Sequence, residues 1–211
     1  GIDAAGLGFT SFCGYGPGSH DSSWWAGGGA HGGKGGKGAQ GGAGSTAGGN
    51  PYDYTNAPIH PGSGGTFAGG GLIRVEAQGE VIANGVIRAN GLGVNGNGAG
   101  GGGGIYIMCS RFSGDTSGIL ETKGGTGSAT LGGGGGGGRI AVWYGIHPSR
   151  WSRIRNGTDP RVLITNSCPL YSGSISVTNG TGYINGPPDG AEPGSFVFIK
   201  DMPHAMVLFL R

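Results

Sequence analysis

Charged side chains are scarce in this chain: they make up 11% of its 211 residues, and the formal net charge at pH 7 is +2. The 13 basic residues are scattered and form no basic stripe, which argues against nucleic-acid binding. Long apolar runs are missing as well, since no stretch approaches the ~20 residues of a membrane-spanning helix. The chain still carries 4 Trp, 7 Tyr and 7 Phe, whereas disordered chains usually combine high charge with few aromatics. We therefore expect a folded domain without a membrane span.

Cysteine is equally scarce, with only Cys13, Cys109 and Cys168 in the chain. The odd number and the wide spacing exclude a Cys-x-x-Cys zinc or redox motif. One disulfide with one free thiol is one interpretation, and a free, buried Cys109 is another, because cysteine also behaves as a small hydrophobe. The spacing identifies no disulfide pair. The five histidines show no metal-ligand spacing either, so we expect no metal site.

Motifs of catalysis are missing too. The stretch 28–35 approaches a phosphate-binding loop, but no Ser or Thr follows Lys34 to hold magnesium. There is no Gly-x-Ser-x-Gly nucleophile motif, and the 11 carboxylates are dispersed. Glycoside hydrolysis needs two carboxylates that flank the bond to be cut. The sequence predicts a protein that is not an enzyme and binds no cofactor. A solenoid enzyme that degrades polysaccharides is the lesser alternative.

What the sequence has in abundance is glycine, which accounts for 56 residues. Between 32 and 43 the glycines form consecutive triplets, and a period of three matches a polyproline-II-type helix. Backbones without side chains can approach closely and satisfy one another's hydrogen-bonding groups. We hypothesise that the tracts near 27–49, 98–104 and 132–138 pack side by side in this way. Flexible surface loops are the alternative.

Two short motifs recur between the glycine tracts. The pattern Gly-x-apolar-x-apolar occurs at 71–75, 103–107, 138–142 and 194–198, and the pattern Gly-x-apolar-polar occurs at 85–88, 118–121 and 173–176. Early copies lie 32 to 35 residues apart, and both motifs stretch to 55 or 56 residues at the last interval. One insertion of roughly 20 residues within 146–171 explains both shifts. The period-two alternation of the motifs predicts strands, and no helix-length apolar periodicity is present.

These features predict an all-β fold without significant helix. We expect a repetitive β-solenoid or stacked β-sheets with packed polyglycine-II-like segments, in one glycine-rich repeat domain over 1–211. Its expected parts are a glycine-rich N-terminal part (1–68), regular repeats of about 33 residues (69–145), an insertion (146–171), and a last repeat with an apolar C-terminal strand (172–211).

The order of the motifs resembles a glycine-rich repeat domain of very large secreted or surface proteins of bacteria, which has relatives in eukaryotes. The resemblance rests on GIDAAGLGF, GGGLIRV, GVIRANG, GGGIYIM, GGGGGGGRIAVWY, GSISVTNG and GSFVFIK, and it covers nearly all of 1–200. It implies an extracellular, β-solenoid-like domain of a structural or adhesive protein, with no catalytic residues to carry over. The insertion at 146–171 and the tail at 202–211 depart from the family pattern.

We therefore expect a non-catalytic structural protein of the cell surface, the extracellular matrix or an extracellular filament. Its expected partners are further copies of itself or neighbouring domains of the same protein. The apolar segments 196–199 and 205–210 suit a strand that caps the repeats or pairs with a neighbouring subunit. The alternative is a carbohydrate-binding or adhesive module that uses exposed aromatic residues.

Five residues are candidate surface sites. Trp24, Trp25 and Trp151 are candidate glycan contacts, because aromatic rings offer apolar faces with polar tips. Their other interpretation is that they cover a stack that lacks large side chains elsewhere. Asn156 and Asn179 begin Asn-Gly-Thr sequons, which matter in a secreted eukaryotic protein.

Overall fold

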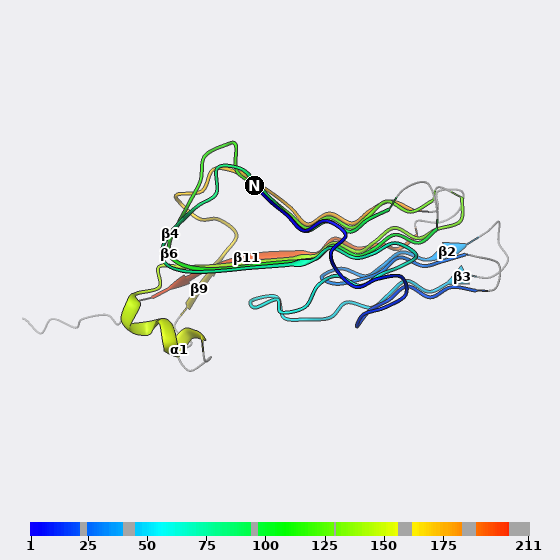
Figure 1. Cartoon of the computed structure of the whole chain (residues 1–211), viewed down its shortest axis with the longest axis horizontal. Helices are drawn as coiled ribbons and strands as arrows, with labels where there is room; N and C mark the ends of the chain where they lie inside the picture. The colour runs from blue at the N-terminus through cyan, green and yellow to red at the C-terminus, as the bar shows by residue number, and fades with distance from the viewer. Residues whose placement is uncertain are drawn as a thin grey trace, which may run out of the picture.

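The computed structural model describes residues 1–21, 25–39, 45–93, 97–128, 130–155, 162–182 and 189–202. Within them the molecule is elongated, with β-sheets at one end and a bundle of extended glycine-rich segments at the other (Figure 1). The strands are β1 (Ile2–Asp3), β2 (Gly38–Ala39), β3 (Ser45–Thr46), β4 (Leu72–Ile82), β5 (Val86–Arg88), β6 (Gly104–Ser113), β7 (Ile119–Glu121), β8 (Arg139–Tyr144), β9 (Val162–Thr165), β10 (Ser174–Ser176) and β11 (Ser195–Asp201). The helices are the 3-10 helix η1 (Pro148–Arg150) and α1 (Trp151–Arg155).

The strands form two main sheets. The four-stranded sheet has the order β1-β5-β7-β10 and is parallel throughout. The five-stranded sheet has the order β4-β6-β8-β11-β9 and is parallel except for β9, which is antiparallel to β11. A separate two-stranded ribbon pairs β2 with β3 at the far end of the glycine bundle (Figure 1).

The recurring motifs pair with one another in register. Ile73 of β4 lies opposite Ile105 of β6, which lies opposite Ile140 of β8, and Ile140 lies opposite Phe196 of β11. The motif alignment predicts these partners, because equivalent positions of successive copies occupy equivalent places in the ladder. Each column of apolar side chains therefore runs across the strands and forms one face of the core.

The predicted fold class, a β-solenoid or a stack of β-sheets without significant helix, is wrong. The strands form two open sheets, and neither sheet closes into a coil. The glycine tracts between the strands offer no side chains to a sheet face, and they leave the sheets and run as a separate bundle. The predicted insertion 146–171 contains the two short helices η1 and α1 and the strand β9. β9 is antiparallel to β11 and ends the run of parallel strands.

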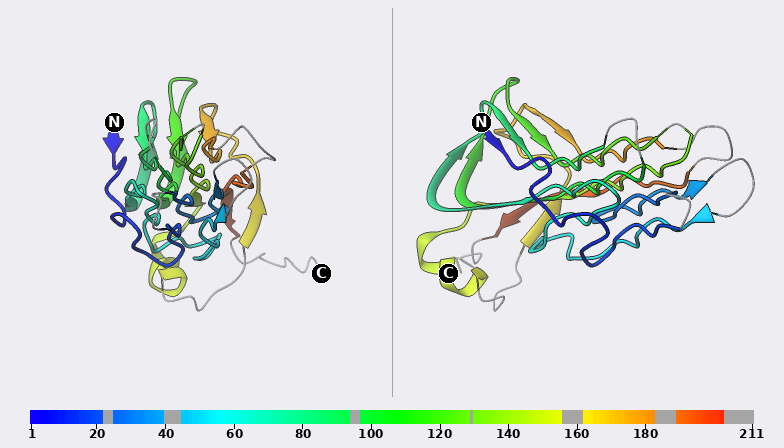
Figure 2. Two further views of the ribbon diagram at one scale, coloured as in Figure 1. Left: turned by 90° about the vertical axis from the view of Figure 1, so that its right-hand side faces the viewer. Right: turned by 45° about the vertical axis from the view of Figure 1, so that its right-hand side comes forward.

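Hydrogen bonds join the glycine tracts laterally. The N–H of Gly36 donates to the Gly134 carbonyl at 2.7 Å, although the two residues are far apart in the chain. Gly29 donates to the Ala99 carbonyl at 2.8 Å, and Ala99 donates in turn to the Gly133 carbonyl at 2.9 Å. The three tracts singled out in the sequence thus satisfy one another's backbone groups, and Figure 2 shows them running side by side.

The main apolar core lies where the two sheets meet. Its members are aliphatic and aromatic side chains from both sheets, among them Ile105, Ile107, Phe112, Leu120, Ile140 and Phe198. A smaller cluster on the other face of the five-stranded sheet packs Tyr106 and Met108 of β6 against Ile146 and Ile154. Helix α1 therefore covers part of a sheet face. None of the described helices has the length and apolar character that crossing a bilayer requires.

Candidate functional site: the open ends of the strand stack

The strands of the two sheets follow one another side by side, and we call this arrangement the strand stack. One end of the strand stack is formed by β1, β4 and the turn 82–86, and we name it the β4 end. β4 pairs with β6 on one side only, and β1 pairs only with β5. In the described part of the chain, no strand covers the outer side of either one. An 11-residue edge strand leaves a row of backbone donors and acceptors available to another strand.

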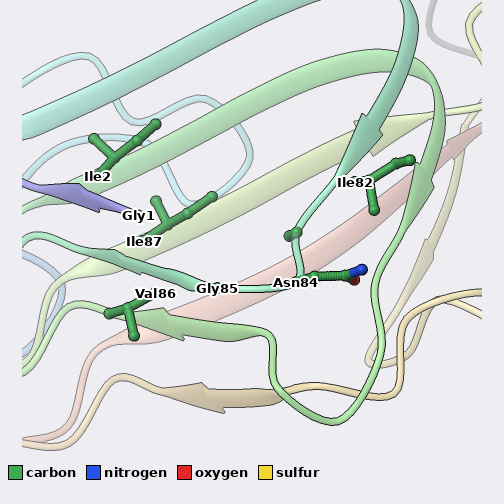
Figure 3. Close-up of a pocket in the computed structure, with 8 residues that line it drawn as sticks. Gly1, Ile2, Ile82, Asn84, Gly85, Val86 and Ile87 are labelled. Atoms are coloured by element: carbon green, nitrogen blue, oxygen red, sulfur yellow. The ribbon is translucent and has the colours of Figure 1, made fainter.

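A shallow groove marks this end (Figure 3). It has a volume of about 200 Å³ and is lined by 1–2 and 82–87. Ile82 is 63% exposed, Ile2 is 45% exposed and Val86 is 36% exposed, so the groove presents apolar side chains to solvent. Exposed apolar side chains grouped around a groove are one feature of surfaces that bind another protein.

The charged residues of the β4 end are paired within the chain. Arg74 lies 2.5 Å from Glu76 and also sits over the ring of Tyr106. Arg88 pairs with Asp3 at 2.6 Å, and this hydrogen bond lowers the pKa of Asp3 to about 2. These contacts satisfy the charges locally and supply no group that is poised for proton transfer.

The opposite end of the five-stranded sheet is formed by β9; we name it the β9 end. Leu163 is 48% exposed and Ile164 is 57% exposed, and β9 pairs only with β11 among the described strands. Beneath it, Arg150 of η1 pairs with Asp201 of β11 at 2.8 Å, with both side chains nearly buried. This ion pair anchors the helical segment to the last strand of the parallel run.

A buried polar cluster lies elsewhere, where the loop 50–61 crosses the glycine bundle. His31 is fully buried; its Nδ1 lies 3.0 Å from the Gly103 carbonyl and its Nε2 lies 3.1 Å from Asp53 Oδ2. Asp53 also accepts N–H donors from Tyr54 and His60, each at 2.9 Å. Burial opposes ionisation of Asp53, but the hydrogen bonds from His31 and the backbone outweigh it and hold its pKa well below the ordinary value.

The neighbouring hydroxyls and cations complete a closed network. Tyr52 donates to the Pro61 carbonyl and accepts from Ser63 Oγ at 2.9 Å. Arg139 of β8 donates to the Tyr52 carbonyl at 2.9 Å and to Thr55 Oγ1 at 3.1 Å. Since the hydroxyl of Tyr52 and the carboxylate of Asp53 are occupied by internal partners, the cluster is arranged to fasten the loop 50–61 to the bundle. A catalytic triad would instead direct a free nucleophile toward solvent.

The structure does not bring the candidate glycan contacts together. Trp24 lies outside the described residues. Trp25 precedes Ala26, whose carbonyl lies beside Gly38 of β2, whereas Trp151 begins α1. Figure 1 shows β2 and α1 at opposite ends of the molecule, so Trp25 and Trp151 share no binding surface.

The remaining predicted sites are separate from one another. Asn156 lies outside the described residues, and Asn179 is half-buried and donates to the Gly180 carbonyl at 3.0 Å. All three cysteines are free thiols: Cys13 is exposed, and Cys109 and Cys168 are buried. Burial raises the pKa of Cys109 to about 12. Among the described residues, no group of three His, Cys, Asp or Glu side chains could hold a metal ion.

No protein-family model, curated protein or solved structure matches this chain. The resemblance to glycine-rich repeat domains of secreted and surface proteins therefore stays a prediction.

Proposed function

We propose that this protein is a non-catalytic structural module of the cell surface, the extracellular matrix or an extracellular filament, and that it associates with itself through the edges of its β-sheets. The observation that carries the proposal is the outer edge of β4, which no strand among the described residues covers and which lies beside the apolar groove of the β4 end. Unpaired strand edges bind further strands through backbone hydrogen bonds. The laterally bonded glycine bundle suits a rigid spacer, because each segment is held by several others.

The mass of the protein in solution tests this proposal. A monomer has a mass of 20.7 kDa. Sedimentation velocity over a hundredfold range of concentration should show species of two or more copies that grow with concentration. A single species of monomer mass at every concentration would rule out self-association.

A carbohydrate-binding or adhesive module is the second candidate. Exposed aromatic side chains favour it: Tyr15 and Tyr54 are 64% and 65% exposed, and Tyr15 packs against His60 at the edge of the buried cluster. Binding to a glycan array that is lost in both Tyr15→Ala and Trp151→Ala variants would support it. Binding that neither substitution changes would count against the aromatic contacts.

A further inference from the structure

We propose that copies of this protein stack head to tail, with β9 of one copy beside β4 of the next. This inference rests on the proposed self-association and adds its polarity and its two surfaces. The partner is a second copy of this chain in the same orientation. Such an interface uses two different surfaces, so each copy has one of each to offer and growth is open-ended.

The two ends of the stack have steps of opposite sense. β4 leads into β5, and β6 leads into β7, so the two sheets share these layers. At the β4 end, the four-stranded sheet extends one strand further, because β1 lies beyond β5 while nothing described lies beyond β4. At the β9 end, the five-stranded sheet extends further, because β11 and β9 lie beyond β8 while nothing described lies beyond β10. In a stack of copies, β1 of one copy therefore enters the recess beyond β10 of the next and occupies one of its two strand positions.

The strand directions also fit this arrangement. β9 runs antiparallel to β11, and β4 runs parallel to the other strands of the five-stranded sheet. When a second copy is placed beyond the first in the same orientation, its β9 meets β4 as an antiparallel neighbour. The ladder then continues from one copy into the next without reversal of either molecule. Figure 2 shows the N-terminal strand and β9 on opposite sides of the stack, as this arrangement requires.

Exposed apolar side chains gather at both ends. The β4 end carries Ile2, Ile82 and Val86, and the β9 end carries Leu163 and Ile164. Each of these is at least 36% exposed, so burial between copies would remove apolar surface from water on both partners. Neither end is covered by the described part of its own chain.

A two-fold pairing of β4 with another β4 fits less well. The register between β4 and β6 shifts between Ala77 and Glu80, which bends β4 near its middle. In an antiparallel β4–β4 pair, the half of each strand that contains this shift would lie opposite the half of the other strand that lacks it, so the two strands would not match along their length. β9 has only four residues and meets one half of β4 alone, so the bend does not interrupt that ladder.

Two variants and their mixture test the polarity. The first carries Ile82→Lys and Val86→Lys at the β4 end, and the second carries Leu163→Lys and Ile164→Lys at the β9 end; all four sites are exposed. Lysine at a strand edge opposes strand addition. The matched control is Ile59→Lys, which is 46% exposed in the native chain but lies in the loop 50–61, away from both ends.

Head-to-tail stacking predicts that each variant alone is monomeric and that an equimolar mixture forms a complex of one copy of each. That complex stops at twice the monomer mass, because its outer ends are both blocked. Formation of the complex also shows that both variants are folded. The Ile59→Lys control should assemble like the native protein.

Other results separate this inference from the proposed function. Dimers formed by either variant alone would overturn head-to-tail stacking while leaving self-association standing. Failure of the mixture to associate, where the native protein does, would overturn it as well. A native protein that is monomeric at every concentration would overturn the proposed self-association itself.

Discussion

Replacing Gly135 by valine should destabilise the fold far more than the same substitution at a glycine with open surroundings. A Cβ added to Gly135 would lie 1.9 Å from the Gly100 carbonyl oxygen and 2.7 Å from its carbon. These are backbone atoms, so no side-chain rotation relieves the overlap. Gly85 provides the matched control, since a Cβ there meets nothing within 4 Å.

The size of the destabilisation by Gly135→Val follows from the backbone contacts that must separate to admit the valine side chain. Gly135 donates to the Gly125 carbonyl at 2.9 Å and accepts from the Gly180 N–H at 2.8 Å. Separation of these backbones loses two hydrogen bonds of ~1 kcal/mol each, and overpacking adds ~1–3 kcal/mol. Valine has less conformational freedom than glycine in the unfolded chain, and this offsets ~0.4–1 kcal/mol of the destabilisation. The net free energy of unfolding should fall by about 2–5 kcal/mol.

Urea unfolding of the native chain, Gly135→Val and Gly85→Val measures the difference. Gly85→Val should stay within about 0.5 kcal/mol of the native protein, because the added side chain meets no neighbouring atom. For a domain of this size, Gly135→Val should lower the melting temperature by roughly 4–20 °C. Equal stability of the two variants would refute the close packing of glycine backbones. Slow amide exchange across 132–138 in the native protein is the independent check, and fast exchange throughout would refute the packing as well.

Three further outcomes are expected. The lowered pKa of Asp53 stabilises the folded state above the ordinary carboxyl pKa, and this stabilisation is lost as the pH falls through the pKa of Asp53 in the folded protein. Asp53→Asn should therefore weaken the dependence of the unfolding free energy on pH, measured by urea unfolding between pH 7 and 2. Alkylation followed by mass spectrometry should label exposed Cys13 in the native state and buried Cys109 only after unfolding. Arg139→Met removes hydrogen bonds to the loop 50–61 and to Ser195, and it should lower stability by about 2–4 kcal/mol. Lys123→Met, at a half-exposed surface pair, should change stability by less than about 1 kcal/mol.

The strand ladder could be predicted from the sequence because glycine and apolar residues recur at fixed spacing. Ile73, Ile105 and Ile140 are equivalent in the motif alignment and are neighbours in the structure. The paths between them could not be predicted in the same way. A glycine tract carries no pattern that shows whether it joins a sheet or leaves it, so the alignment is compatible with both a solenoid and two open sheets.

The buried cluster was missed for a related reason. His31 and Asp53 are 22 residues apart and belong to no motif, and the loop between them gives no sign that it folds back. One signal was present: His31 is a bulky polar residue inside a glycine tract, where only a specific partner makes its burial favourable. The candidate glycan contacts failed to converge because they were grouped by their aromatic side chains, and residue type alone does not show where in the fold a residue lies.

The glycine bundle should also leave a mark on the heat capacity of the protein. Apolar surface exposed on unfolding gives most globular domains a heat-capacity increase of about 12–15 cal/mol/K per residue, and exposed polar surface lowers it. A bundle joined by backbone hydrogen bonds, in a chain with 56 glycines, exposes mainly peptide groups when it separates. The increase per residue should therefore fall below that range. The stability of such a protein then varies little with temperature and declines only gently on cooling.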